Sequence, residues 1–241
     1  MENATKIGVN HSGIQMSPLQ GREQVEFAAS QDPDPAGDAF AIGAERMHYI
    51  GMADRLGSVP VPATGKGLLK TAAGKFKGAN PEVLIDKLGQ RLAYERSGVR
   101  LYEAMIMKAQ AAGCGRKPEL LADLNQIREE EESHFHMLTE VIRGLGADPT
   151  AQTPGADVSG VATLGLVQVI TDPSTTVAQC LEALLTAELT DHACWELLIE
   201  LAREQGEQDM AAGFDAALAA EARHLHTIRE WLRTMLAEAA R

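Results

Sequence analysis

Two short stretches decide the fold of this 241-residue chain: Glu131-Glu132-Ser133-His134 and, ninety residues later, Glu221-Ala222-Arg223-His224. On a helix, residues three apart lie on one face, so each stretch places a carboxylate and an imidazole on the same side. Two such pairs, joined by one inward Glu from each of two further helices, form the ligand set of a carboxylate-bridged dinuclear metal site in a four-helix bundle.

Four segments after residue 80 show the spacing of helices that face a common core. In each, an inward stripe advances by alternating steps of about three and four residues, which is typical of a helical bundle. The stripes are Leu84, Leu88, Leu92, Glu95, Val99, Tyr102 and Ile106; Leu120, Leu124, Ile127, Glu131, His134, Leu138, Val141 and Leu145; Val177, Leu181, Leu184, Glu188, Asp191, Trp195, Leu198 and Ala202; and Met210, Phe214, Ala217, Glu221, His224, Ile228, Trp231 and Met235. Each is apolar at both ends and polar near its middle, and none carries a Lys or Arg.

The polar middles of the four stripes predict one site. Its expected ligands are Glu95, Glu131 and His134 for one metal and Glu188, Glu221 and His224 for the other. Four carboxylates and two neutral imidazoles carry four negative charges, which two divalent ions cancel, whereas unpaired carboxylates in a core would cost several kcal/mol. The alternative is a set of buried ion pairs or a solvated stripe, but the shared register favours a metal site.

Two further stripe residues allow two interpretations each. Asp191 lies one turn after Glu188, where the first helix has Gly98. It is either a seventh ligand or a hydrogen-bond partner of a ligand histidine. Tyr102 either serves the site, by bonding a ligand carboxylate or by electron transfer, or is a core aromatic with a satisfied hydroxyl. Mixed carboxylate and imidazole ligands suit iron or manganese, and ligand type alone does not exclude zinc.

The connections predict how the helices follow one another. Short links near 113–118 and 205–208 make two antiparallel hairpins, and about thirty residues rich in Gly, Pro, Asp and Thr separate the second helix from the third. The expected fold is therefore an all-α four-helix bundle over 80–241, with a long crossover between helices two and three. Residues 1–79 form an irregular N-terminal extension, partly extended, with short helices opening at Ser17-Pro18 and spanning about 38–56.

Composition excludes several classes of protein. The net charge of −12 argues against nucleic acid as a partner. No apolar run approaches the roughly 18 residues of a membrane span, and no cleavable leader is recognisable. Cys114, Cys180 and Cys194 form no Cys-x-x-Cys pair, so neither a disulfide framework nor a rubredoxin-type centre is expected. We expect a cytoplasmic protein whose electron donor, where one is needed, is a separate molecule.

Residues 80–241 resemble the ferritin-like superfamily, especially its rubrerythrin and bacterioferritin branches. The resemblance rests on Glu95, Glu131-x-x-His134, Glu188 and Glu221-x-x-His224. Rubrerythrins also place a tyrosine seven residues after the first Glu, as Tyr102 does, and an acid three residues after the third, as Asp191 does. The resemblance implies a di-iron centre that reacts with O₂ or H₂O₂, in iron handling or peroxide defence. Because no fifth helix follows the fourth, a homo-oligomer such as a dimer is expected rather than a cage.

Three rival interpretations remain open from the sequence. Manganese catalases share the fold and much of this ligand pattern, so a dimanganese catalase is the nearest alternative chemistry. A metal-binding or storage module without turnover would need the same residues. A structural bundle with buried ion pairs would need none of the metals.

Overall fold

The computed structural model describes residues 18–31, 39–62, 64, 65, 67, 68, 80–114 and 117–241. Within these ranges seven helices occur and no strand. The chain divides into two units, Met1–Asp54 and Arg55–Arg241. The predicted all-α fold is therefore confirmed.

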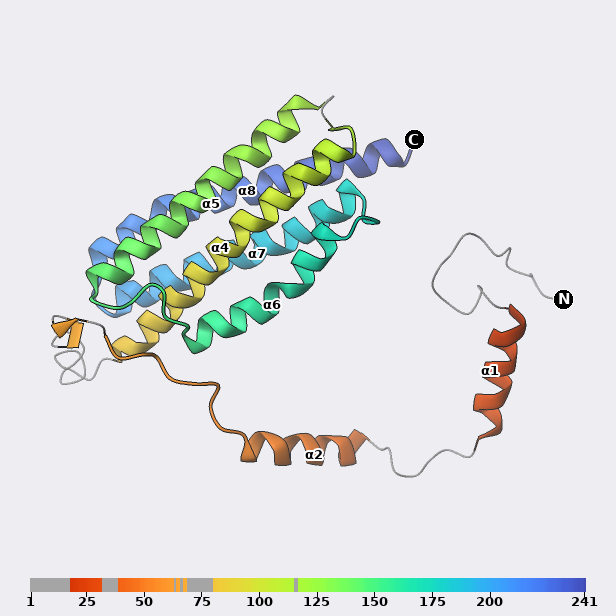
Figure 1. Ribbon diagram of the computed structural model, residues 1–241, viewed down its shortest axis with the longest axis horizontal. Helices are drawn as coiled ribbons and strands as arrows, with labels where there is room; N and C mark the ends of the chain where they lie inside the picture. The colour runs from red at the N-terminus through yellow and green to blue at the C-terminus, as the bar shows by residue number, and fades with distance from the viewer. Residues whose placement is uncertain (1–17, 32–38, 63, 66, 69–79, 115–116) are drawn as a thin grey trace. The chain divides into compact units, whose positions relative to one another are not determined.

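The first unit contains two short helices, α1 (Pro18–Ser30) and α2 (Ala39–Met52) (Figure 1). Both lie where the sequence predicts short helices, although Ser17 falls outside the described residues. No residue of α2 is buried, and Phe40, Met47 and Ile50 are among its exposed apolar side chains. The helix thus has no core of its own.

The division between the units lies at Asp54, whereas the sequence places the boundary at residues 79 and 80. Part of the intervening chain is attached to the bundle. The Thr64 hydroxyl donates to the Gly146 carbonyl at 3.2 Å, and the Gly67 amide donates to the Thr64 hydroxyl at 3.1 Å. Residues 69–79 lie outside the described part of the chain, so the predicted boundary stays a prediction.

Four long helices make up the bundle: α4 (Pro81–Ala111), α5 (Pro118–Gly144), α7 (Val177–Glu204) and α8 (Gln208–Ala239). Helices α4 and α5 form one antiparallel hairpin and α7 and α8 the other, with α4 also packed on α7 and α5 on α8 (Figure 1). Helices α5 and α7 run in the same direction (Figure 1), so the segment between them crosses the length of the bundle. The predicted long crossover is confirmed.

Local sequence sets the ends of these helices. Pro81 and Pro118 occupy the first turns of α4 and α5, where a missing amide hydrogen costs nothing. Thr176 caps α7 in a reciprocal arrangement with Gln179, each side chain bonding the other's backbone amide. Glycines with positive φ follow three of the helices: Gly113 at +76°, Gly146 at +81° and Gly206 at +79°. Such a left-handed residue ends a helix at little cost when it is glycine.

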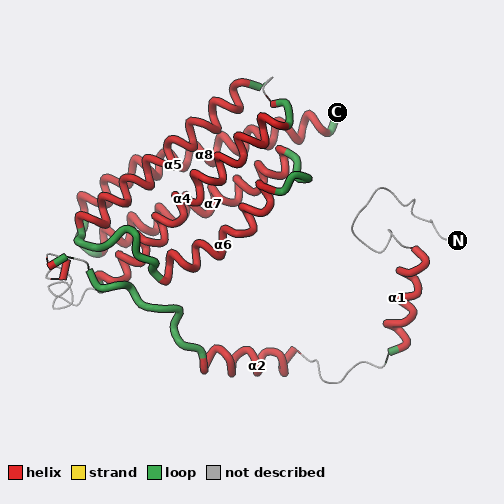
Figure 2. The backbone as a smooth tube through the Cα atoms, viewed as in Figure 1, coloured by secondary structure: helices red, strands yellow, loops and turns green. Residues whose placement is uncertain are grey.

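The crossover contains a helix that the sequence does not predict, α6 (Pro154–Thr171), which packs against α4 and α7 (Figure 2). Thr153 caps it by accepting a hydrogen bond from the Ala156 amide. The Gly155 amide donates to Asp86 on α4 at 2.8 Å. A Cβ atom at Gly89 would lie 2.8 Å from the Thr153 hydroxyl, so only glycine allows this close approach.

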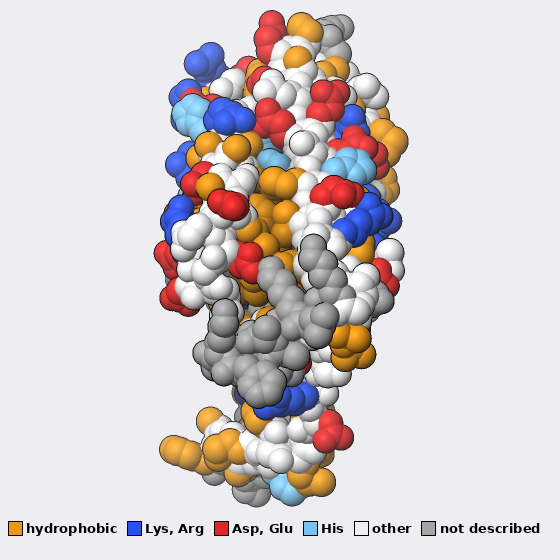
Figure 3. Space-filling model, turned by 90° about the vertical axis from the view of Figure 1, so that its left-hand side faces the viewer, with side chains coloured by type: hydrophobic (Ala, Val, Ile, Leu, Met, Phe, Trp, Pro, Cys, Tyr) orange, Lys and Arg blue, Asp and Glu red, His pale blue; other side chains and the backbone are white. Residues whose placement is uncertain are grey.

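The outer face of α6 has no charge. Between residues 158 and 169 it carries no ionisable side chain, and Val158, Val161 and Leu164 are exposed. The surface is more mixed on the face drawn in Figure 3, where acidic and basic side chains surround a strip of hydrophobic ones. None of the described helices combines the length and the low polarity needed to cross a bilayer.

Two apolar clusters fill the bundle and leave a polar layer between them. One includes Tyr102, Leu124 and Leu181, and the other includes Leu88 and Trp195. The eight predicted stripe positions of α7 are all buried. The predicted pattern, apolar at both ends and polar in the middle, is confirmed along α7, whereas in α4 Val99 and Ile106 are half-buried and Leu101 and Met105 are buried.

Candidate metal centre

All the predicted ligand side chains meet in the polar layer. Each is at most 7% exposed: Glu95, Glu131, His134, Glu188, Asp191, Glu221 and His224. The internal repeat extends to burial, because the pattern of buried and exposed positions from 131 to 138 is the same as that from 221 to 228. Two matching helical faces thus bring two matching pairs of ligands to one depth in the bundle.

Both histidines direct the Nδ1 atom at the acids. His134 Nδ1 lies 2.9 Å from Glu221 Oε1 and 3.5 Å from Glu95 Oε2. His224 Nδ1 lies 3.4 Å from both Glu131 Oε1 and Glu221 Oε2, and 3.7 Å from Glu188 Oε2. The two oxygens of Glu221 therefore face different histidines.

Three groups of potential ligand atoms lie within 4.8 Å of one another. They are Glu131, Glu188, Glu221 and His224; Glu95, His134 and Glu221; and Glu95, Glu131, Asp191 and Glu221. The sequence pairs Glu131 with His134, whereas the structure brings Glu131 beside His224 and Glu221 beside both histidines. Glu221 belongs to all three groups, and Glu95 and Glu131 belong to two each.

The donor atoms themselves fit a metal. Buried atoms without a hydrogen-bond partner among the described residues include both oxygens of Glu95 and Glu221, one oxygen each of Glu131 and Glu188, and Nδ1 of both histidines. Because a buried polar atom left unsatisfied costs about 1–3 kcal/mol, such a concentration indicates a ligand. Carboxylate oxygens and imidazole nitrogens are suitable donors for a divalent transition metal.

One prediction from the sequence is wrong: a basic residue does face the core. Arg91 on α4 is 3% exposed, with Nε 3.0 Å from Glu95 Oε1 and Nη2 3.0 Å from Asp191 Oδ1. Steps of three and four residues lead from Leu88 through Arg91 to Glu95 as well as they do through Leu92. Both Arg91 and Leu92 are buried, so the stripe is two residues wide at this point.

The single positive charge of Arg91 is too small to neutralise all the buried carboxylates as ion pairs. Five buried carboxylates carry five negative charges, and Arg91 cancels one of them. With both imidazoles protonated, two negative charges would still be left over. With neutral imidazoles, the form that binds metals, four are left over, which is the charge that two divalent cations neutralise.

The acids respond to this crowding by holding protons. Burial, together with the neighbouring Glu221 carboxylate, raises the pKa of Glu188 to about 8. Burial and the other carboxylates also raise the pKa of Glu131 well above its usual value. Glu221 behaves differently: although burial opposes its charge, its contacts with His134 and His224 lower its pKa to about 2. For His134, the contacts with Glu221 and Glu95 outweigh the effect of burial and raise its pKa to about 9.

Comparison with known proteins agrees with this architecture. Residues 118–236 match the family model for the ferritin-like domain. This part of the chain is a ferritin-like domain. Symerythrin from Cyanophora paradoxa is 26% identical over 142 residues, which are 57% of this chain and 79% of that protein. No solved structure gives a match.

Tyr102 lies at the edge of the ferritin-like site. Its hydroxyl donates a hydrogen bond to Glu188 Oε1, across the bundle from its own helix α4. Burial raises the pKa of Tyr102 well above 10, and the Glu188 carboxylate adds to the shift, so the hydroxyl keeps its proton. The structure places Tyr102 in contact with a candidate ligand, as in the first of the two interpretations from the sequence.

The ferritin-like site also contains a residue that the sequence does not predict, Glu130. Its Oε2 lies 2.6 Å from His224 Nε2 and 3.3 Å from Arg223 Nη2. A carboxylate on the far nitrogen of a ligand histidine fixes the ring's tautomer and orientation. Glu130 therefore holds His224 with Nδ1 facing the acids. Its place beside Glu131 in a run of four Glu is the one signal in the sequence.

Substituting Glu130 by Gln is expected to weaken metal binding by about 10–100-fold, because His224 loses the partner that orients it. The affinity would be measured by competition with a coloured chelator. Glu129→Gln is the matched control, since Glu129 is 70% exposed in the same run and makes only a 3.8 Å contact with Arg128. Equal affinities of the two variants would contradict this role of Glu130.

Proposed function

We propose that the polar layer binds two metal ions, iron in the first place, and that the protein is a di-iron oxidoreductase reacting with O₂ or H₂O₂ in iron handling or peroxide defence. The observation that carries the proposal is the buried group of carboxylate and imidazole atoms without hydrogen-bond partners. The proposed ligands are Glu95, Glu131, His134, Glu188, Glu221 and His224, with Asp191 as a candidate seventh.

The unpaired atoms suggest which oxygens bind. Glu221 has both oxygens unpaired and one beside each histidine, which suits a bridge between two ions. Glu188 has Oε1 occupied by the Tyr102 hydroxyl and Oε2 unpaired, which suits binding through a single oxygen. Tyr102 in this way holds a proton at the edge of the site and orients the carboxylate.

When bound, two ferrous ions would supply the two electrons that, with two protons, reduce H₂O₂ to two molecules of water. The chain provides the surroundings for that reaction. The apolar clusters on both sides exclude water from the polar layer, which strengthens every electrostatic contact inside it. Glu130 and Tyr102 keep a histidine and a carboxylate in fixed orientations. An external electron donor would be needed for a second turnover.

The proposal is tested first by the metal content of protein purified without added metal. We expect two iron ions per chain by elemental analysis. Anaerobically reduced protein mixed with H₂O₂ or O₂ should then show an absorbance change in a stopped-flow instrument. Two manganese ions and oxygen evolution from peroxide would favour the catalase instead. Iron that does not react would favour storage, and a protein that takes up no metal under metal-replete conditions would overturn the proposal.

The expected homo-oligomer stays a prediction, for which α6 offers a surface. Two copies of a chain with a net charge of −12 repel each other, so an uncharged apolar face is where they can approach. We propose a dimer rather than a cage, and the native mass measured by light scattering decides between them. A 24-subunit mass would contradict the dimer.

A further inference from the structure

We propose that Arg91 is a positioning residue that withholds Asp191 from the metals and restricts Glu95 to binding through one oxygen. This inference rests on the proposed function, because it concerns how that same site is built. It gives Asp191 a role that differs from both of those that the sequence leaves open, because Asp191 is paired with Arg91 rather than with a metal or a ligand histidine.

The guanidinium of Arg91 joins two helices by two charged contacts. Nε lies 3.0 Å from Oε1 of Glu95, one turn along α4, and Nη2 lies 3.0 Å from Oδ1 of Asp191 on α7. Nη1 also donates to the Asp191 backbone carbonyl at 3.5 Å. Asp191 is thus held by both its side chain and its main chain. A planar guanidinium can contact two carboxylates in fixed directions, which a Lys ammonium cannot.

Arg91 is itself held in place. Its guanidinium carbon lies 4.4 Å from the centre of the Tyr94 ring and 5.9 Å from that of the Trp195 ring. Tyr94 is fixed in turn, since its hydroxyl donates to the Ala187 carbonyl at 2.9 Å. Such contacts with aromatic faces stabilise the guanidinium in this position. The side chain therefore has little freedom to release its two acids.

The consequence for metal binding follows from which oxygens are left. Arg91 occupies the Oε1 side of Glu95, and Oε2 faces His134 at 3.5 Å. Arg91 also cancels the charge that Asp191 adds, so the remaining four carboxylates match two divalent ions. Without Arg91, Asp191 would be an unpaired buried carboxylate beside Glu95, Glu131 and Glu221, close enough to bind an ion.

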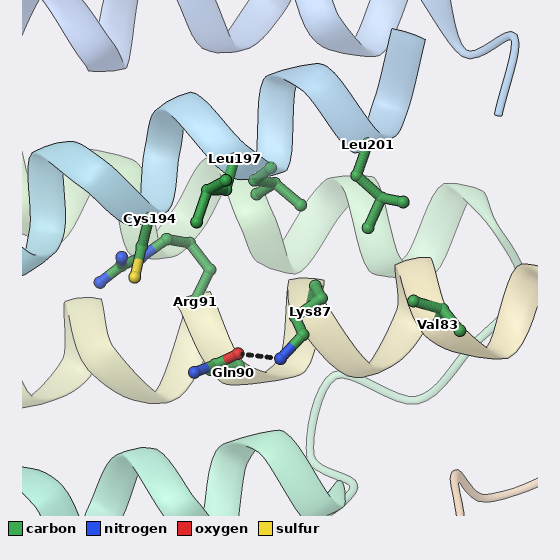
Figure 4. Close-up of a pocket in the computed structure, with 8 residues that line it drawn as sticks. Val83, Lys87, Gln90, Arg91, Cys194, Leu197 and Leu201 are labelled. Atoms are coloured by element: carbon green, nitrogen blue, oxygen red, sulfur yellow. Dashed lines mark hydrogen bonds between the residues drawn. The ribbon is translucent and has the colours of Figure 1, made fainter. Parts of the chain in front are cut away.

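Arg91 also separates the acids from a cavity. A space of about 270 Å³ between α4 and α7 is lined by Arg91 together with Lys87, Gln90, Cys194 and Leu197, among others. Figure 4 shows Arg91 reaching from α4 toward α7, with its guanidinium beside Cys194. Truncation of Arg91 would therefore leave a hole that small cations can enter from this cavity.

The test is a set of four proteins, freed of metal and titrated with Co²⁺: wild type, Asp191→Asn, Arg91→Met and the double variant. The visible absorption of Co²⁺ reports the number and type of its ligands. We expect two Co²⁺ per chain and one spectrum for wild type and D191N, because Asp191 is not a ligand. R91M should shift the spectrum as Asp191 joins, and D191N in that background should remove the shift.

Several results would overturn the inference. A changed spectrum or a lost Co²⁺ in D191N alone would make Asp191 a ligand while Arg91 is present. An unchanged spectrum in R91M would show that Arg91 withholds nothing. If wild type itself binds no Co²⁺ and no iron, the proposed function fails rather than the role of Arg91.

A second measurement covers the case in which R91M does not fold, which thermal melting of the metal-free variants by circular dichroism would show. Arg91→Ala leaves the hole open to the cavity, so guanidinium at millimolar concentration should restore the wild-type melting and the wild-type Co²⁺ spectrum. Methylammonium should not, because it contacts one carboxylate at a time. Equal rescue by both cations, or rescue by neither, would contradict the forked contact.

Discussion

Replacing Glu221 by alanine is expected to abolish stoichiometric binding of both metal ions. Its two oxygens face His134 and His224 separately, at 2.9 and 3.4 Å, and it belongs to all three groups of potential ligand atoms. Substitution of residues that merely orient ligands costs about 10–100-fold in affinity, so the loss of a shared ligand should exceed 100-fold. Elemental analysis after metal-replete purification and dialysis measures the result.

The matched control for this variant is Glu132→Ala. Glu132 lies next to Glu131, its side chain is 49% exposed, and its one ion pair is with Arg128 on the surface. It should keep two metals per chain, which shows that the loss in E221A is not a general effect of removing acid. Two metals retained in E221A would sink the assignment of Glu221 as the bridge. Circular dichroism of both variants verifies that the bundle is still helical.

Gly98→Ala is expected to damage the site without touching a ligand. A Cβ atom at Gly98 would overlap Glu131 Oε2, and the three atoms nearest to it all belong to the Glu131 side chain. The carboxylate would have to move out of the polar layer or the helices α4 and α5 would have to separate. Overpacking of this kind costs about 1–3 kcal/mol in the free energy of unfolding. Denaturant unfolding and a metal titration should both show a loss.

Gly213→Ala is the control for the glycine itself. Gly213 also lies within a helix, α8, but it is exposed and an added Cβ would meet no atom within 4 Å. Alanine there should raise the free energy of unfolding by about 0.5–1 kcal/mol, because glycine weakens a helix by that amount. If G98A stabilises the protein as G213A does and keeps its metals, Gly98 is not reserved for the Glu131 carboxylate.

The part of the site that the sequence predicts is the part that helical periodicity controls. The step from Glu131 to His134, and its repeat from Glu221 to His224, is a property of one helix and needs no knowledge of its neighbours. Glu95 and Glu188 follow from the same rule, because each sits at the middle of an otherwise apolar stripe. A common depth in the four helices then brings them together.

Helical periodicity does not predict the roles of residues that act through the end of a long side chain. Periodicity places a Cβ atom, whereas the Arg91 guanidinium contacts Asp191 on α7 and the Glu130 carboxylate contacts His224 on α8. Neither contact is encoded in the spacing along α4 or α5. The role of Gly98 cannot be predicted either, because glycine has no side chain whose position the spacing could indicate. Its role becomes clear only from the Glu131 side chain that lies beside it.

The composition of α6 is the reason that the sequence does not predict this helix. A surface helix normally shows a polar face that alternates with an apolar one, and that alternation identifies it. From residue 158 to 169 α6 has no charged side chain, and the helix contains three glycines, Gly155, Gly160 and Gly165. Its stability comes from packing on α4, through the contact of Gly155 with Asp86 and the fit of Thr153 against Gly89. Those contacts join residues far apart in the sequence.

The internal repeat that relates α4 and α5 to α7 and α8 is broken at one position. There α4 has Gly98, whereas α7 has Asp191, which Arg91 holds. Near the His134 end the cation is the buried Arg91, which contacts Glu95, whereas near the His224 end it is the exposed Arg223, which contacts the Glu130 carboxylate behind the imidazole. A divalent cation approaching the metal-free protein therefore meets less repulsion at the His224 end and should bind there first. A half-loaded species would then precede the full one, and calorimetry would register it as two separate heats.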